Sequence, residues 1–261
     1  MVQQQSELPE EGGGFPPIRI IAPGAPWRWL HKGWADLRAA PFASLFYGAV
    51  LALMGVVLVR AVGQAAYALA LVTGFLLVGP FLSMGLYDVS RRLERGERVA
   101  LASTLAAWKD NAPAIGFYAV ILALLMAVWI RVSVVVVALF FEGGVPTLRT
   151  LAHDILNSEN GLFFLFAYLA AGAGFALLVF ATSVVSLPML LDRAKMDTLT
   201  AMITSFNVLR LNFAAMVLWA AVIVVLTAIG FATFYLGLVV LMPLVGHATW
   251  HAYREAVGGD L

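Results

Sequence analysis

Two histidines near the C-terminus have the residue type and the spacing that could support metal chemistry. His247 and His251 lie four residues apart, so in a helix both side chains project from the same face. Two histidines one turn apart can chelate one metal ion, as in helix-borne zinc or copper sites. A third ligand would have to come from His31, Asp88 or Glu255. The pair cannot supply both axial ligands of one haem, because those ligands approach the iron from opposite faces.

The same pair also has a purely structural interpretation, which we favour. It lies near the inner end of a predicted membrane helix, where polar residues hydrogen-bond neighbouring helices or lipid headgroups. We therefore predict no tightly bound metal, with His247 packed against a neighbouring helix and His251 nearer the headgroups. A haem or a divalent metal at this pair stays open as the alternative.

Few other ionisable residues lie near the membrane interior. Arg131 comes about 19 residues into its predicted helix, roughly 28 Å at 1.5 Å per residue, so we expect its side chain to snorkel to the outer interface. At greater depth it would be a functional residue. Asp88 and Asp192 end two predicted spans and are followed closely by Arg91 and Arg193. We predict interfacial ion pairs here, because no chain of acidic residues leads into the membrane.

Several function classes lack their residues. The chain has no cysteine, which excludes disulfides, thiolate metal sites and cysteine nucleophiles. It has no phosphate-binding loop, no nucleophile with an adjacent base and no metalloprotease helix. The net charge of +1 gives no argument for binding nucleic acid. The sequence therefore favours a non-catalytic protein without a predicted cofactor.

The elements that must position these residues are membrane helices. With 62% hydrophobic and 12% charged residues, the chain has more apolar surface than one soluble core could bury. Six runs are long enough to cross a core of about 30 Å, which needs roughly 20 helical residues. They lie near 41–59, 65–89, 112–132, 162–191, 212–227 and 230–253. A single helix of roughly 40 residues over the last two is the poorer alternative, because Gly230 and the span limit favour a hairpin.

Basic residues set the predicted orientation. The loop 87–111 carries Arg91, Arg92, Arg95, Arg98 and Lys109, which marks it as cytoplasmic by the positive-inside rule. By alternation, 13 of the 16 basic residues fall on that side. We therefore predict a multi-pass protein of a bacterial inner membrane with both termini in the cytoplasm. Residues 1–25 are expected to be a mostly disordered tail.

Three stretches on the cytoplasmic side have helical periodicity but are too polar to span. Each is expected to lie along the inner interface as an amphipathic helix with its apolar face toward lipid. Their apolar positions are Trp27, Leu30, Trp34 and Leu37, then Leu101, Leu105 and Trp108, then Met196, Leu199, Ile203 and Phe206.

Joining each interfacial helix to the two spans that follow predicts one transmembrane domain, 26–257, made of three hairpin units. The units run 27–95, 96–194 and 195–255, and the middle one carries a periplasmic insertion at 133–161. The returning spans contain Pro80, Pro188 and Pro243, which we expect at comparable depths, each bending its helix. Asn111 and Asn212 open two outward spans and are predicted to act as N-caps.

Four segments resemble a family of uncharacterised bacterial integral membrane proteins. They read GWADLRAAPFASLFYG at 33–48, GPFLSMGLYDVSRRLERGE at 79–97, PMLLDR at 188–193 and GHATWHAYR at 246–254. The resemblance covers about residues 30–257. Some members carry the label of cytochrome c oxidase subunit. The resemblance implies the fold and the location but no catalytic residues, and four histidines are too few for a haem–copper oxidase core.

These observations favour an accessory or stabilising subunit of a larger inner-membrane complex, with a respiratory complex related to cytochrome c oxidase as one candidate. Its expected partners are the lipid bilayer and other membrane subunits, and the expected contact is at Phe163 and Phe166, where aromatic residues crowd the start of a span. Two alternatives stay open. One is a small-molecule permease or channel, and the other is a metal- or haem-binding protein that uses His247 and His251.

Overall fold

The protein is described by a computed structural model, which covers residues 15–61, 83–141, 153, 155 and 160–258. These residues form helices joined by turns and contain no strand, which confirms the predicted all-helical class. The helices are α1 (Ala25–Ala39), α2 (Pro41–Ala61), α4 (Met84–Glu94), α5 (Leu101–Leu105), η1 (Ala107–Asn111), α6 (Ala112–Phe140), α8 (Gly161–Ser183), α9 (Ser186–Asp192), α10 (Thr198–Leu211), α11 (Phe213–Ala232) and α12 (Leu238–Ala256).

Three helical segments of the described chain are long and apolar enough to cross a membrane. They are Leu101–Phe140, Gly161–Asp192 and Phe213–Ala232. A fourth qualifies only if α1 and the first part of α2 are taken as one span, although the two are bent by 107°. The predicted six spans are therefore not confirmed. The second predicted span, 65–89, falls mostly outside the described residues, and α12, at the place of the sixth, is polar over its second half.

Helix boundaries differ from the predicted ones in three places. The fourth predicted span is broken between α8 and α9, just before Pro188, whereas α12 continues through Pro243. Pro80 lies outside the described residues, as does most of the insertion 133–161. The turn between α11 and α12 falls after residue 232, later than expected, with Phe234 and Tyr235 in the left-handed region at φ 53° and 69°. The chain is thus not one 40-residue helix here.

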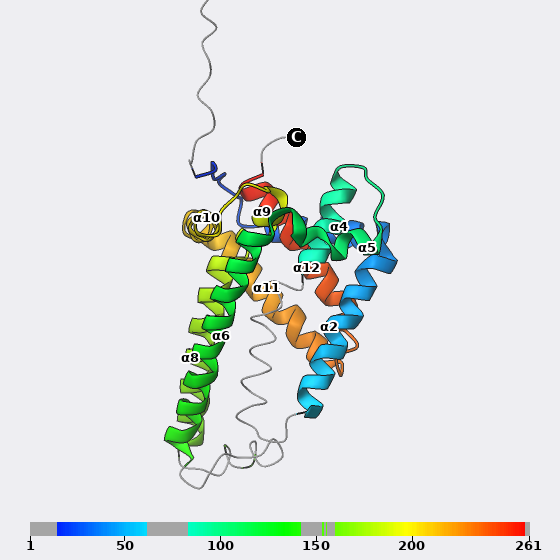
Figure 1. Cartoon of the computed structure of the whole chain (residues 1–261). Coiled ribbons are helices and arrows are strands. Elements are labelled where there is room, and N and C mark those ends of the chain that lie inside the picture. The colour runs from blue at the N-terminus through cyan, green and yellow to red at the C-terminus, as the bar shows by residue number, and fades with distance from the viewer. Residues whose placement is uncertain (1–14, 62–82, 142–152, 154, 156–159, 259–261) are drawn as a thin grey trace, which may run out of the picture.

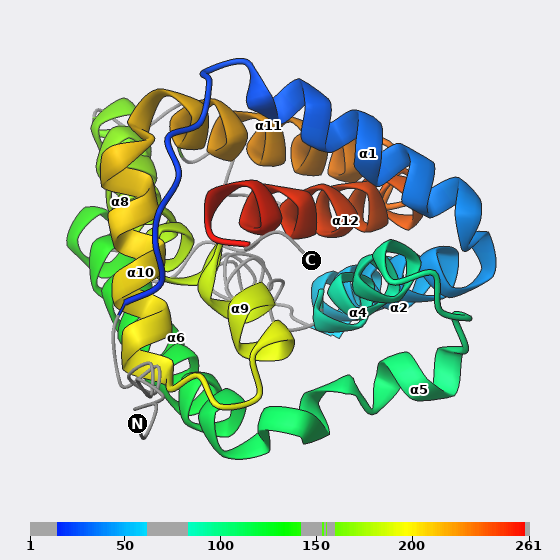
Figure 2. The same cartoon turned by 90° about the horizontal axis from the view of Figure 1, so that it is seen from above.

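The helices form two parts that are distinguished by direction (Figure 1). α6 and α8 run side by side along the length of the molecule, and α2 and α11 run in the same general direction. Seen from above, α1, α10 and α5 with η1 lie across one end and surround α4, α9 and the end of α12 (Figure 2). We call α1, α5 with η1, and α10 the crossing helices, and this whole end of the molecule the polar layer.

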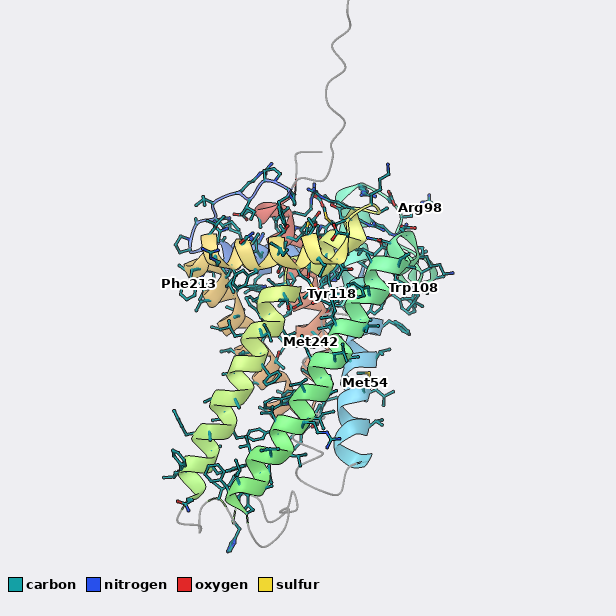
Figure 3. The ribbon with its side chains drawn as sticks, turned by 60° about the vertical axis from the view of Figure 1, so that its left-hand side comes forward. Met54, Arg98, Trp108, Tyr118, Phe213 and Met242 are labelled. Atoms are coloured by element: carbon teal, nitrogen blue, oxygen red, sulfur yellow. The ribbon has the colours of Figure 1, made fainter. Side chains whose placement is uncertain are left out.

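The crossing helices expose much of their predicted apolar stripe. On α1, Trp27 is 61% and Trp34 41% exposed, whereas Leu37 is buried together with Trp29 and Gly33. The interior face of α1 is thus a separate stripe, because the helix packs against the protein as well as facing outward. The exposed apolar residues of the other two crossing helices are Leu105, Trp108, Leu199, Ile203 and Phe206, and Figure 3 shows Trp108 at the rim of the molecule.

Capping fixes where the third crossing helix begins. The Asp197 carboxylate accepts a hydrogen bond of 2.9 Å from the backbone N–H of Thr200, which satisfies one of the free donors of the first turn. This hydrogen bond from the backbone lowers the pKa of Asp197. Asp197 therefore ends the link from α9 and starts α10 with an ionised cap.

Glycines allow α1 and α2 to approach α12 closely. A Cβ atom added to Gly33 would lie 2.8 Å from the backbone nitrogen of Ala248, and one added to Gly48 would lie 2.0 Å from the carbonyl oxygen of Val239. Backbone atoms cannot move aside as a flexible side chain can. Close contact at small residues is how helices associate in membranes, so both positions fix α12 against its neighbours.

We predict that Gly48→Val separates α2 from α12 and lowers the thermal unfolding temperature of the purified protein in detergent. Overpacking of this kind costs about 1–3 kcal/mol. The matched control is Gly116→Ala on α6, because no described atom lies within 4 Å of a Cβ at that glycine. Equal unfolding temperatures for the two variants would contradict the close packing of α2 on α12.

Candidate functional site

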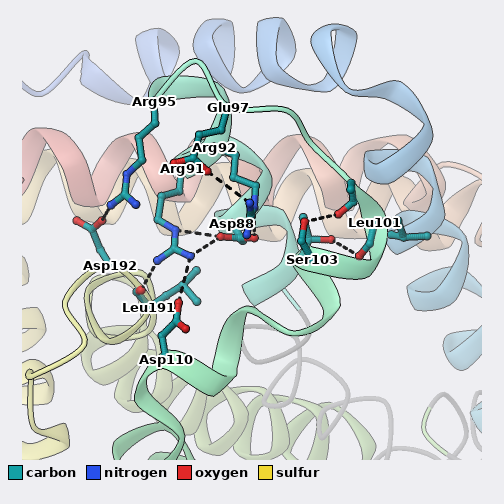
Figure 4. Close-up of polar contacts among 12 residues, drawn as sticks. Asp88, Arg91, Arg92, Arg95, Glu97, Leu101, Ser103, Asp110, Leu191 and Asp192 are labelled. Atoms are coloured by element: carbon teal, nitrogen blue, oxygen red, sulfur yellow. Dashed lines mark hydrogen bonds and ion pairs between the residues drawn. The ribbon is translucent and has the colours of Figure 1, made fainter.

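Asp88 is the centre of a buried ion cluster on α4. Its side chain has no solvent exposure, and it accepts hydrogen bonds from Arg91 Nε at 2.9 Å and Arg92 Nε at 2.7 Å. The spacings i, i+3 and i, i+4 place the three side chains on one side of the helix. Arg91 also donates through Nη1 to the carbonyl oxygen of Leu191 at 2.6 Å, as Figure 4 shows. The cluster therefore joins α4 to the end of α9, and the ion pairing predicted for Asp88 is present.

Asp192, at the end of α9, is also ion-paired, but not with Arg193, its neighbour in the sequence. Its Oδ1 accepts from Arg95 Nη2 at 3.2 Å, and its Oδ2 lies 3.5 Å from Arg254 Nη1. Arg193, the residue next in sequence, donates instead to the carbonyl oxygen of Val257 at 3.1 Å. Asp192 thus connects α9 to both α4 and α12.

Aromatic and charged groups of α12 complete these connections. Trp250 Nε1 and Arg254 Nε donate to the two carboxylate oxygens of Glu94, each at 3.0 Å. Tyr253 Oη donates to Asp192 Oδ2 at 2.8 Å. Three side chains from one turn of α12 therefore tie it to α4 and α9, and the charge-assisted hydrogen bonds among them are the stronger kind.

The two histidines belong to a different polar group. His247 is fully buried, with Nε2 at 2.9 Å from Ser44 Oγ and Nδ1 at 2.8 Å from Ser90 Oγ. His251 is partly exposed, and its Nε2 lies 2.8 Å from Asp36 Oδ2. His247 is packed between α2 and α4, as predicted, while His251 faces α1.

The proposed third metal ligands do not join the histidines. His31 is exposed on α1, and Asp88 is held by its arginines. Glu255 accepts from Trp29 Nε1 at 2.8 Å and from Arg28 at 2.5 Å. Within the described ranges, no group of three or more histidine or acidic side chains is placed to hold a metal ion.

Asn111 and Asn212 hold neighbouring chain segments and do not cap their own helices. Both occupy the N-cap position, but neither makes a side-chain cap hydrogen bond. The Asn111 amide donates to the carbonyl oxygens of Leu190 and Met196 at 3.1 and 3.0 Å. Asn212 accepts from the backbone N–H of Ile21 at 2.7 Å and donates to the carbonyl oxygen of Arg19 at 3.1 Å. The predicted N-cap positions are correct, but the capping hydrogen bonds are not made, because the side chains reach across to other segments.

The second of these contacts orders part of the expected tail. Residues 15–24 run across α10 and the end of α12 (Figure 2), and Arg19 N–H donates to the carbonyl oxygen of Ala256 at 2.9 Å. Ile21 is buried against the core. Residues 15–24 therefore form a docked segment, while 1–14 lie outside the described residues.

The remaining predicted residues lie in the long helices. Arg131 is exposed on α6, which continues nine residues further to Phe140, about 13 Å at 1.5 Å per residue. It therefore lies inside its helix and not at the outer end, which is where the predicted span 112–132 placed it. Phe163 and Phe166, at the start of α8, are 65% and 69% exposed.

Sequence reasoning missed the partners of the histidines. Ser44 and Ser90 are both buried and stand in apolar or charged stretches without a motif. The only signal in the sequence was a serine at the same predicted membrane level as His247. Asp36 was missed because α1 was expected to lie on lipid with no protein partner.

We predict that Asp88→Asn destabilises the protein by about 3–5 kcal/mol, because it leaves the charge of buried Arg91 without its partner. The measurement is the thermal or denaturant midpoint in detergent. Asp110→Asn is the control, since Asp110 is 63% exposed and lies 3.9 Å from the same arginine, where a pair is worth at most about 1 kcal/mol. A comparable loss in both variants would argue against a buried ion cluster.

Comparison with known proteins adds one finding. Residues 68–192 match the model of a family described as "Predicted integral membrane protein (DUF2189)", a stretch that includes Asp88, Arg91 and Asp192. That description does not mention cytochrome c oxidase. No curated protein and no solved structure matches the chain. The match supports an uncharacterised membrane family, and the chain is an integral membrane protein with several apolar helices.

Proposed function

We propose that the protein is a non-catalytic accessory or stabilising subunit of a larger complex in a bacterial inner membrane, with the polar layer on the cytoplasmic side. The observation that carries this proposal is the use of its ionisable groups. Asp192, Glu94 and Glu255 each accept hydrogen bonds from other helices of the same chain. Asp88 binds Arg91 and Arg92 of its own helix, and Arg91 in turn donates to the end of α9. These groups hold helix ends together, which is the work of a scaffold.

The surface proposed for the partner is the α6–α8 pair. The two helices pack through Trp129, which is buried against Tyr168 and Phe175 with ring centroids at 5.7 and 5.2 Å. Ser133 Oγ and Tyr168 Oη are 2.7 Å apart. These contacts between the two helices hold the pair together, and the pair lies at one side of the molecule (Figures 1 and 3).

The outward face of α8 suits a helix of another subunit. Phe163, Phe166, Ala170 and Gly174 are all exposed and recur at helical spacing along one face. No described atom lies within 4 Å of a Cβ at Gly174. Lipid tails are as apolar as leucine, so association in a membrane depends on close packing at small residues. The two phenylalanine rings, followed by the small residues Ala170 and Gly174, offer that shape.

We predict that replacing Phe163 and Phe166 together with alanine releases the proposed partner subunit, because the two rings supply most of the large contact surface. Gly174→Leu should have the same effect by blocking close approach. The measurement is copurification from native membranes in mild detergent, followed by identification of the accompanying chains. Phe42→Ala is the matched control, because Phe42 is 77% exposed on α2.

A lone monomer in native lipid nanodiscs at every expression level would remove the accessory-subunit proposal and favour the permease alternative. Loss of the partner in the Phe42→Ala control would show that the contact is not specific to α8.

The scaffold is further proposed to consist of three units, 27–95, 96–194 and 195–255, which hold one another in a ring. Asn111 of the second unit binds the chain around 190–196, which leads into the third. Asn212 of the third unit binds residues 19–21, which lead into the first. Ala40 and Ala43 of the first unit pack with Val99 and Leu101 of the second. Each unit thus contacts the chain at or just before the start of the next unit.

We predict that Asn212→Ala opens this ring at residues 15–24. The buried N–H of Ile21 would lose its acceptor, which costs about 1–3 kcal/mol. Trypsin should then cut after Arg19 faster than in the native protein, as measured by the rate at which the chain loses the mass of the residues up to Arg19. Asn207→Ala, in the preceding helix α10, is the control. An unchanged cleavage rate in Asn212→Ala would contradict the proposed closure.

A further inference from the structure

Five polar contacts follow one another from the interior of the polar layer to its surface. They run from the Ala40 carbonyl oxygen through Ser44, His247 and Ser90 to Asp36, and end at His251. The successive distances are 2.8, 2.9, 2.8, 2.7 and 2.8 Å. Ser44, His247 and Ser90 are buried, whereas the side chains of Asp36 and His251 are 16% and 14% exposed. We call this series the serine–histidine chain.

Counting hydrogens shows that this series lacks one. Each contact needs one hydrogen, and each serine supplies one. Ser44 donates to the Ala40 carbonyl oxygen, so the Nε2–H of His247 must point to Ser44. A neutral ring then has no hydrogen on Nδ1. Ser90 can fill its contact with His247 or its contact with Asp36, but not both. With neutral His247 and ionised Asp36, four hydrogens are available for five contacts.

One added proton fills every contact, either on Asp36 Oδ2 with Ser90 donating to His247, or on His247 Nδ1 with Ser90 donating to Asp36. Asp36 Oδ2 lies within hydrogen-bond distance of both Ser90 and His251, and as a carboxylate it accepts from both. Burial lowers the pKa of His247 to about 4, the Asp36 carboxylate of α1 acts against this shift, and His251 of α12 adds to it. The elements α2 and α4 present Ser44 and Ser90 to the ring. A carboxylate therefore stands one hydroxyl away from the ring that would carry the positive charge.

We propose that His247 and Asp36, bridged by Ser90, form a binding site for one proton that exchanges with water at the Asp36–His251 end. A proton taken up at Asp36 Oδ2 passes to Ser90 Oγ as the hydrogen of Ser90 passes to His247 Nδ1. The loaded site holds an imidazolium that donates to Ser90 and Ser44, and Ser90 donates to Asp36. One proton enters, no other bond changes, and the net charge rises by one.

The site joins four helices. Asp36 belongs to α1, Ser44 to α2, Ser90 to α4 and His247 to α12. The extra hydrogen bond completes the path from α12 through α4 to α1, so proton uptake at the polar layer acts on the contact between α1 and α4.

The test is nitrogen NMR of the intact protein, labelled with 15N in its four histidines and held in lipid nanodiscs. The His247 signals are identified by their loss in His247→Gln. We expect one protonated ring nitrogen, Nε2, at the high end of the range over which the protein stays folded, and two at the low end. A ring that is neutral throughout, or that carries its hydrogen on Nδ1 at the high end, would overturn the proposal.

Variants separate the shared site from an ordinary histidine. Ser90→Ala and Asp36→Asn should each lower the proton affinity of His247 about tenfold or more, one unit in the titration midpoint. Ser90→Thr keeps the hydroxyl and should keep the midpoint, and Ser103→Ala, which removes a partly exposed serine that donates to Ala100, is the control. Asp36→Asn alters the partly exposed end and serves if Ser90→Ala does not fold. An unchanged midpoint in the bridging variants would contradict the proposal.

Discussion

Charges placed inside the end of an apolar bundle must be neutralised by groups of the same chain. Asp88 has no exposure, and an isolated carboxylate in that position would be prohibitively costly. Arg91 and Arg92, one turn later on α4, neutralise this charge. Arg91 also donates to a carbonyl oxygen at the end of α9. The solution therefore fixes α4 against α9, and the neighbouring groups fix α12 against both.

The crossing helices follow from that arrangement. Once α4, α9 and the end of α12 form the centre, α1, α10 and α5 with η1 can each cover one side of it (Figure 2). Such a helix needs one stripe for the protein and another for the surroundings. On α1 these stripes are Trp29 with Gly33, and Trp27 with Trp34. Amphipathic periodicity read as a single apolar face thus conceals two faces with different neighbours.

Local features were largely predictable from the sequence. The extent of α2, the start of α11, the amphipathic crossing helices and the pairing of Asp88 with Arg91 depend on residues within a few turns of one another. The partners of Asp192, Asn212 and His247 did not follow from sequence, because they lie 61 to 203 positions away. Their choice depends on which helices meet, and composition does not encode this. The docking of residues 15–24 was missed for the same reason, since a proline- and glycine-rich segment has no periodicity to reveal an asparagine that binds it.

We infer that the polar layer, and not the apolar spans alone, holds this membrane protein together. Hydrogen–deuterium exchange of the native protein in lipid nanodiscs tests it directly, because exchange reports local opening residue by residue. We predict slow exchange in α4, α9 and the second half of α12, although these lie at the end of the molecule that carries most of its charge. Exchange there as fast as in the exposed turn around Gly96 would show that the polar layer does not hold the helices together.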